Sequence, residues 1–134
     1  MSADQITLTV PCRAEFAKTV RMTASALVSR TAATYDDLDD VRMAAEEIFV
    51  FACDHASDDS QITVEFELAA DEVSMKVRLE AADRSADEEV ERRSAYASFI
   101  LQSVTDHMEF SSDLEGQYLL VTKRLAGEPD DAGI

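Results

Sequence analysis

Two neighbouring segments alternate apolar and polar residues without interruption, and this pattern restricts the chain to folds that contain a sheet. The apolar positions are Ile62, Val64, Phe66 and Leu68 in the first segment and Val73, Met75, Val77 and Leu79 in the second. Residues two apart lie on one face of a strand, so each segment has a single apolar face. The short junction Ala69–Asp71 predicts an antiparallel hairpin.

Apolar residues recur at helical spacing in three other segments. These segments run from Arg13 to about Ala32, from about Asp36 to Ala56, and from Ser94 to about Thr105. Three further strands are expected, at Gln5–Val10, at Met108–Phe110 and at Tyr118–Leu125. A sheet with one apolar face needs a covering layer. The order therefore predicts an α/β fold, a two-layer α/β sandwich. Its sheet of about five strands is mixed and mostly antiparallel, and three helices cover one face.

The remaining segments are predicted to be connections. The stretch Ala81–Arg93 is charged and poor in bulky apolar residues, which indicates a loop or a mobile lid, and Ser111–Gly116 is read as a turn. Glycine, proline and acidic residues follow Leu125, which is typical of disorder. One domain over residues 1–125 with a disordered acidic tail at 126–134 is expected.

The charge balance is strongly acidic, with 12 Lys and Arg against 28 Asp and Glu and a net charge of −16. Nucleic-acid binding is not expected, because phosphate contacts need a basic face. The negative charge either keeps the protein soluble or speeds its association with a basic partner. The sequence has no signal-peptide pattern and no membrane-spanning run, so a cytoplasmic location is expected. Cys12 and Cys53 fit neither a metal site nor a disulfide framework, and both are expected to be reduced thiols.

Four groups of residues occur in a fixed order. They are Pro11 with Phe16, Val20 and Arg21; Tyr35–Leu38 through Glu47 and Ala52 to His55-Ala56; Phe99–Leu101 with Val104–Asp106; and Gly116 with Lys123 seven residues later. In this order they resemble the GHKL ATPase superfamily and, within it, the small bacterial anti-sigma factor serine kinases. The resemblance implies a Bergerat-like fold.

The resemblance also implies a nucleotide site, and the sequence departs from it. In the family, a glutamate at the position of Glu47 is the general base and an asparagine four residues later holds Mg²⁺. This chain has Phe51 there, and a phenyl ring offers Mg²⁺ no oxygen ligand. Asp83 matches the adenine-binding aspartate, but no glycine follows it, and the first glycine of the chain is Gly116. Lys123 in the last strand belongs to the same implied site.

These departures predict that Mg-ATP binding is lost and that the chain uses no cofactor; Mg-ATP is the cofactor if the family activity is retained. Glu47 is then either a base or a remnant that is exposed or paired with an arginine. Phe51 either plugs a vacated nucleotide pocket or belongs to the ordinary core. No metal site is expected, because Asp36–Asp40 lack the glycine and glutamate of a calcium loop.

The resemblance implies regulation of transcription through protein contacts. We expect a sigma factor, an anti-anti-sigma protein or both as partners, with Arg13–Arg30 as the contact segment, and a homodimer through the first helix region. Two alternatives stay open. One is an active serine/threonine protein kinase that phosphorylates an anti-anti-sigma factor with Glu47 as base. The other is a generic adaptor of the same fold.

Overall fold

A single five-stranded sheet organises the computed structural model, which describes residues 3–31, 33–57, 59–80 and 88–125. Its strands are β1 (Asp4–Pro11), β2 (Gln61–Leu68), β3 (Glu72–Leu79), β4 (His107–Asp113) and β5 (Gly116–Arg124). The spatial order is β1-β2-β3-β5-β4, and every neighbouring pair is antiparallel. The expectation of a mixed sheet is therefore wrong in this detail. The hairpin β2–β3 is confirmed, with Leu68 opposite Val73.

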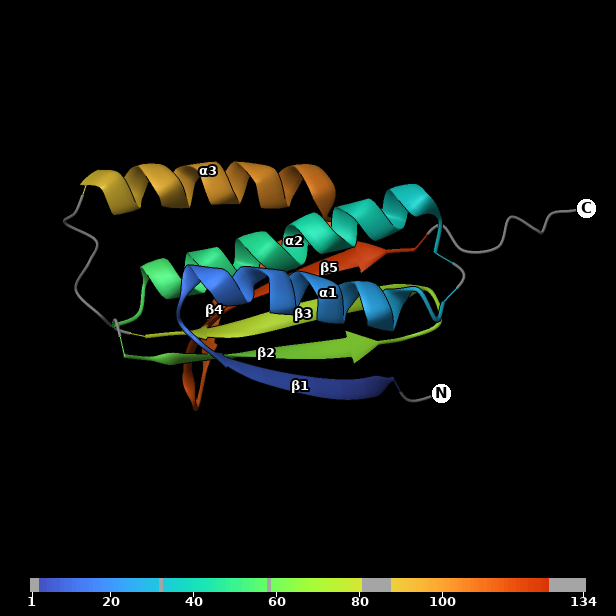
Figure 1. Cartoon of the computed structure of the whole chain (residues 1–134), viewed down its shortest axis with the longest axis horizontal. Helices are drawn as coiled ribbons and strands as arrows, with labels where there is room; N and C mark the ends of the chain where they lie inside the picture. Colours follow the sequence, from blue (N-terminus) through green and yellow to red (C-terminus); the bar gives the residue numbers. More distant parts are fainter. Residues whose placement is uncertain (1–2, 32, 58, 81–87, 126–134) are drawn as a thin grey trace, which may run out of the picture.

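The helices lie on one face of the sheet (Figure 1). They are α1 (Ala17–Val28), which follows a short 3-10 turn at Ala14–Phe16, α2 (Tyr35–Asp54) and α3 (Glu88–Val104). Helices α1 and α2 run side by side, and α3 packs mainly on α2. This arrangement confirms the predicted two-layer α/β fold.

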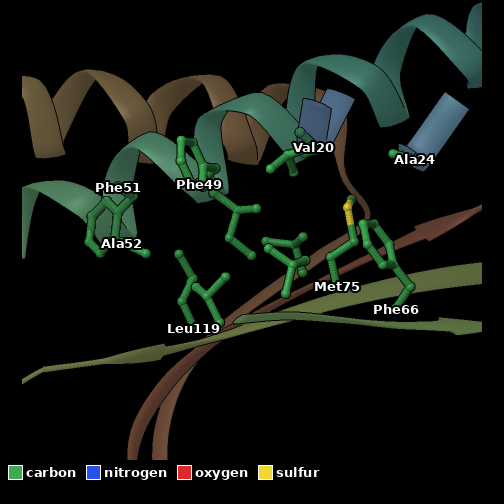
Figure 2. Close-up of a cluster of buried hydrophobic side chains, with 14 of the residues drawn as sticks. Val20, Ala24, Phe49, Phe51, Ala52, Phe66, Met75 and Leu119 are labelled. Carbon is green, nitrogen blue, oxygen red and sulfur yellow. The ribbon is translucent and has the colours of Figure 1, made fainter. Parts of the chain in front are cut away.

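The alternating residues of β2, β3 and β5 form the sheet side of the core. Ile62, Val64, Phe66, Val73, Met75, Val77, Leu119 and Val121 are all buried. Figure 2 shows Val20 and Ala24 of α1 and Phe51 and Ala52 of α2 in the same cluster as Met75 and Leu119. Close packing of this cluster holds both helices against the strands.

A capping box begins α2. The Thr34 hydroxyl accepts a hydrogen bond from the Asp37 amide at 3.0 Å, and the Asp37 carboxylate accepts one from the Thr34 amide at 3.3 Å. These bonds pair two backbone donors that a helix start otherwise leaves unpaired. The helix consequently starts at Tyr35, one residue before the expected Asp36.

The predicted lid at 81–93 is wrong for its last six residues, because α3 begins at Glu88 rather than Ser94. Glu88, Glu89 and Glu91 lie in the first turn, where the helix dipole favours negative charge. Val90 is buried. Arg93 lies 3.8 Å from Glu89 at a spacing of four residues, a pair that supports a helix. Residues 81–87 of the predicted lid, and the tail at 126–134, lie outside the described residues.

The turn expected at Ser111–Gly116 is also wrong in extent. Strand β4 continues to Asp113, and only Leu114 and Glu115 connect it to β5. Gly116 has a φ of +120°, a backbone conformation that favours glycine. The Arg78 guanidinium donates two hydrogen bonds to the Asp113 carboxylate, at 2.7 and 2.8 Å, and thereby ties the hairpin to β3. This ion pair lowers the pKa of Asp113 to about 2.

Candidate nucleotide-binding region

Phe51 faces inward at the C-terminal end of α2. Its side chain is 5% exposed. The ring stacks on His55 one turn later, with centroids 4.4 Å apart and planes at 23°. It also contacts Phe110 of β4 at 5.5 Å. The position that the resemblance assigns to a metal-binding asparagine is therefore filled by an aromatic ring packed on two other rings.

Helix α3 is fixed to this end of α2 by polar contacts. The Arg93 guanidinium donates two hydrogen bonds to the Asp54 carboxylate, both at 3.0 Å. The His55 Nδ1 atom is hydrogen-bonded to the Phe51 carbonyl oxygen at 2.9 Å. The His55 Nε2 atom lies 3.4 Å from the Ser94 hydroxyl. His55 therefore makes hydrogen bonds at the C-terminal end of α2. The second turn of α3 thus lies beside Asp54 and His55.

Glu47 lies in a groove between α2 and α3. Val50, Arg92, Arg93 and Tyr96 line the same groove, whose volume is about 330 Å³. Burial raises the pKa of the Glu47 carboxyl, and the neighbouring Glu46 carboxylate raises it further. The groove therefore holds one carboxyl that takes up a proton more readily than an ordinary glutamate.

One of the alternatives left open for Glu47, an ion pair with an arginine, is made by its neighbour Glu46. Glu46 binds Arg21 of α1 at 2.7 Å, whereas Glu47 makes no ion pair within the described part of the chain. Consecutive residues on a helix point about 100° apart, so only one of the two glutamates faces α1. Sequence alone gave no means of choosing between them.

The raised pKa of Glu47 leads to a pH-dependent prediction. Since the folded chain binds this proton more tightly than the unfolded chain, ionised Glu47 lowers the free energy of unfolding above its folded pKa. The penalty disappears as the pH falls toward the ordinary value of 4.5. Glu47→Gln should therefore raise the melting temperature at pH 7 and raise it less at pH 4. Glu46→Gln is the matched control and should lower it at pH 7, because it removes the ion pair with Arg21.

Lys123, another predicted site residue, pairs with a residue far from Phe51 on α2. The Lys123 ammonium binds the Asp40 carboxylate at 2.9 Å. Asp40 precedes Phe51 by 11 residues, which is about 16 Å along the helix axis. Asp83 lies outside the described residues. Glu80, just before that stretch, accepts hydrogen bonds from the Ser57 amide at 3.2 Å and the Ser60 hydroxyl at 2.6 Å.

No group of three or more histidine, cysteine or acidic side chains in the described ranges is arranged to hold a metal ion. None of the described helices is both long and apolar enough to cross a membrane.

Helix α1 presents a second candidate surface. Its inner face buries Val20, Ala24 and Val28. A shallow depression runs along its outer face, lined by Glu15, Lys18, Thr19, Met22, Thr23 and Ala26. Met22 is 54% exposed there. This surface lies within Arg13–Arg30, the segment that the family resemblance implies for partner contact.

Sequence reasoning missed the residues that join α3 to α2. Arg93 was assigned to the end of a loop or lid and Ser94 to the start of a helix, whereas the two residues bind Asp54 and His55. The available signal was the spacing of Glu89 and Arg93, four residues apart, which favours a helix through this stretch.

Comparison with known proteins identifies relatives and a family for this chain. A serine-protein kinase RsbW from Bacillus velezensis is 26% identical over 98% of this chain and 92% of its own length. The RsbW of Halalkalibacterium halodurans is 39% identical over 42% of this chain and 35% of its own length. That of Staphylococcus aureus is 33% identical over 55% and 49%. The histidine kinase-like ATPase domain matches residues 10–123, so this chain belongs to that family, as its sequence predicts.

Proposed function

We propose that this chain is an anti-sigma-factor-like regulator that binds a protein partner and does not depend on kinase turnover. The observation that carries the proposal is the buried Phe51 at the position of the metal-binding asparagine. A divalent ion there would meet an aromatic ring in place of an oxygen ligand. A nucleotide would in turn meet the stack of Phe51, His55 and Phe110.

The start of α3 supports the same conclusion. In related nucleotide sites, glycines before a helix let backbone amides approach phosphates. Here the residues from Glu88 to Ser94 already belong to helix α3, and none of them is a glycine. Glu88, Glu89 and Glu91 add negative charge at this helix end, which disfavours a triphosphate.

Thermal unfolding with and without millimolar Mg-ATP tests this proposal. A ligand at one hundred times its dissociation constant stabilises a fold by about 2.7 kcal/mol, which is a shift of several degrees for a domain of this size. We expect the protein to unfold cooperatively without ligand and its melting temperature to stay unchanged when Mg-ATP is added. A clear shift that requires Mg²⁺ would overturn the proposed loss of nucleotide binding.

The partner of the proposed function is a sigma factor, an anti-anti-sigma protein or both. Two features support a protein partner: the exposed Met22 on the outer face of α1, and the net charge of −16, which favours a basic surface. Capture from a native lysate at low salt should recover a sigma factor. Recovery of other proteins only would favour the generic adaptor instead.

One observation favours an active kinase as the second candidate. Glu47 lies in a groove with a raised pKa, and a general base works best when its pKa approaches the working pH. Phosphate transfer from Mg-ATP to an anti-anti-sigma protein, abolished by Glu47→Ala, would establish this activity. Absence of transfer with a partner that binds tightly would reject it.

A further inference from the structure

A hollow lies on the face of the sheet that is turned away from the helices. In the part of the chain that the structure describes, α1, α2 and α3 all lie on the other face (Figure 1). The hollow has a volume of about 360 Å³ and is lined by side chains of β1, β2, β3 and β5. Strand register sets Thr7, Glu65, Lys76 and Leu120 in one row across it. These residues alternate with the buried residues of the same strands, so they point away from the core.

One wall of the hollow is aromatic and is held by its neighbours. The Tyr118 hydroxyl of β5 donates a hydrogen bond to the Glu109 carboxylate at 3.3 Å. The Lys76 ammonium lies 4.8 Å from the centre of the Tyr118 ring, and the Arg78 guanidinium lies 5.3 Å from it. Cations at these distances are attracted by the ring. The contacts fix the Tyr118 ring and direct the Lys76 side chain toward β5.

The opposite side of the hollow is acidic. Glu65 and Glu67 of β2 and Glu72 of β3 line it. Lys76 is the cross-strand neighbour of Glu65, but its ammonium lies against the aromatic wall instead of the carboxylate. Within the described ranges, none of the three glutamates makes an ion pair. This side of the hollow therefore keeps negative charge that no cation of the described chain offsets by direct contact.

The spacing of these charges fits an extended basic peptide. Glu65 and Glu67 are two residues apart on the outward face of β2, which places their Cα atoms about 7 Å apart. Alternate residues of an extended peptide have the same separation and point to the same side. Arginine suits these positions, because its guanidinium pairs with a carboxylate through two hydrogen bonds and its aliphatic stem packs on apolar surface. Half-buried Leu120 offers such a surface in the same row.

We propose that the open face of the sheet docks an extended, arginine-bearing segment of a partner protein, with Glu65 and Glu67 as its recognition residues. Alternate arginines of the segment pair with the two carboxylates, and an arginine stem covers Leu120. The net charge of −16 favours encounter with a basic segment, and the hollow selects one that is extended. This surface is separate from the outer face of α1 and from the groove at Glu47, and it does not depend on the function proposed above.

The test measures binding of a labelled synthetic peptide, in which arginine and threonine alternate, to the purified full chain by fluorescence anisotropy at low salt. Glu65→Gln with Glu67→Gln should weaken binding about tenfold, because both pairing partners are lost. The matched control is Glu88→Gln with Glu91→Gln, which removes the same charge from exposed positions of α3 and should change the affinity by less than about twofold. Lys76→Gln should strengthen binding about threefold, because it removes a cation beside the carboxylates.

A second peptide of the same composition, with its arginines consecutive, tests the extended spacing and should bind more weakly. Equal binding of the two peptides, or equal weakening by the two double variants, would show that only net charge matters and would overturn the proposal. Failure of the parent chain to bind the alternating peptide at low salt would overturn it as well. Sedimentation of the same samples adds one more test: a dimer that dissociates on Glu65→Gln with Glu67→Gln would assign this face to a second copy of the chain instead.

Discussion

Replacing Phe51 with alanine is expected to lower the free energy of unfolding by about 3–5 kcal/mol, the range for a large side chain lost from a core. Phe51 is 5% exposed and packs on His55 and Phe110, so its removal leaves a cavity and undoes both ring contacts. In thermal unfolding, this loss corresponds to a drop of roughly 10 °C or more. Chemical denaturation gives the free energy directly.

The matched control is Phe99→Ala. Phe99 lies on α3 with 65% of its surface exposed, and its replacement should change stability by no more than about 0.5 kcal/mol. A small effect at both positions would mean that Phe51 is not part of the core in solution. Phe51→Asn adds a second comparison: it should destabilise the fold without producing a thermal shift with Mg-ATP.

Replacing Met22 with arginine should weaken binding of the proposed sigma-factor partner at least tenfold. Met22 is the large apolar side chain exposed on the outer face of α1, and such side chains contribute most at the centre of an interface. Arginine replaces this contact with a charge that must be desolvated and that repels a basic partner. Titration calorimetry at constant salt measures the change in dissociation constant.

Leu114→Arg is the control for this substitution. Leu114 is fully exposed at the tip of the β4–β5 hairpin, so the variant adds the same charge outside α1. Both variants should unfold within about 0.5 kcal/mol of the parent chain. Full affinity of Met22→Arg would exclude α1 from the partner surface. A complex that does not weaken with added salt would argue against a charge-assisted partner.

Local patterns predicted the elements of the fold better than their ends. Strands β2 and β3 each show one clear alternation of apolar and polar residues, and α2 shows one apolar stripe at helical spacing. The sequence therefore predicted all three elements. The start of α3 was missed because its charged residues resemble a loop unless pairs four apart are considered. The length of β4 depends on Arg78 binding Asp113, a contact across 35 residues that no local pattern contains.

The candidate site was predictable only in part. The positions of Phe51 and His55 near the end of one helix follow from the helical spacing of that segment. The residues that contact them do not follow from the sequence. Phe110 and Ser94 belong to other elements and meet α2 only through tertiary packing. The same limit applies to Glu46 and Glu47, since the choice between them depends on where α1 lies.

The attachment of α3 has a consequence for local unfolding. Helix α3 buries Val90, Ala97 and Leu101, whereas α2 buries eight residues. Elements with few buried contacts open at a smaller free-energy cost than the core does. Opening of α3 breaks the contacts of Arg93 and Ser94 with α2 while the sheet stays intact. Amide hydrogens of α3 are therefore expected to exchange with solvent ahead of those of α2, and opening of α3 should make the surroundings of Phe51 accessible without global unfolding.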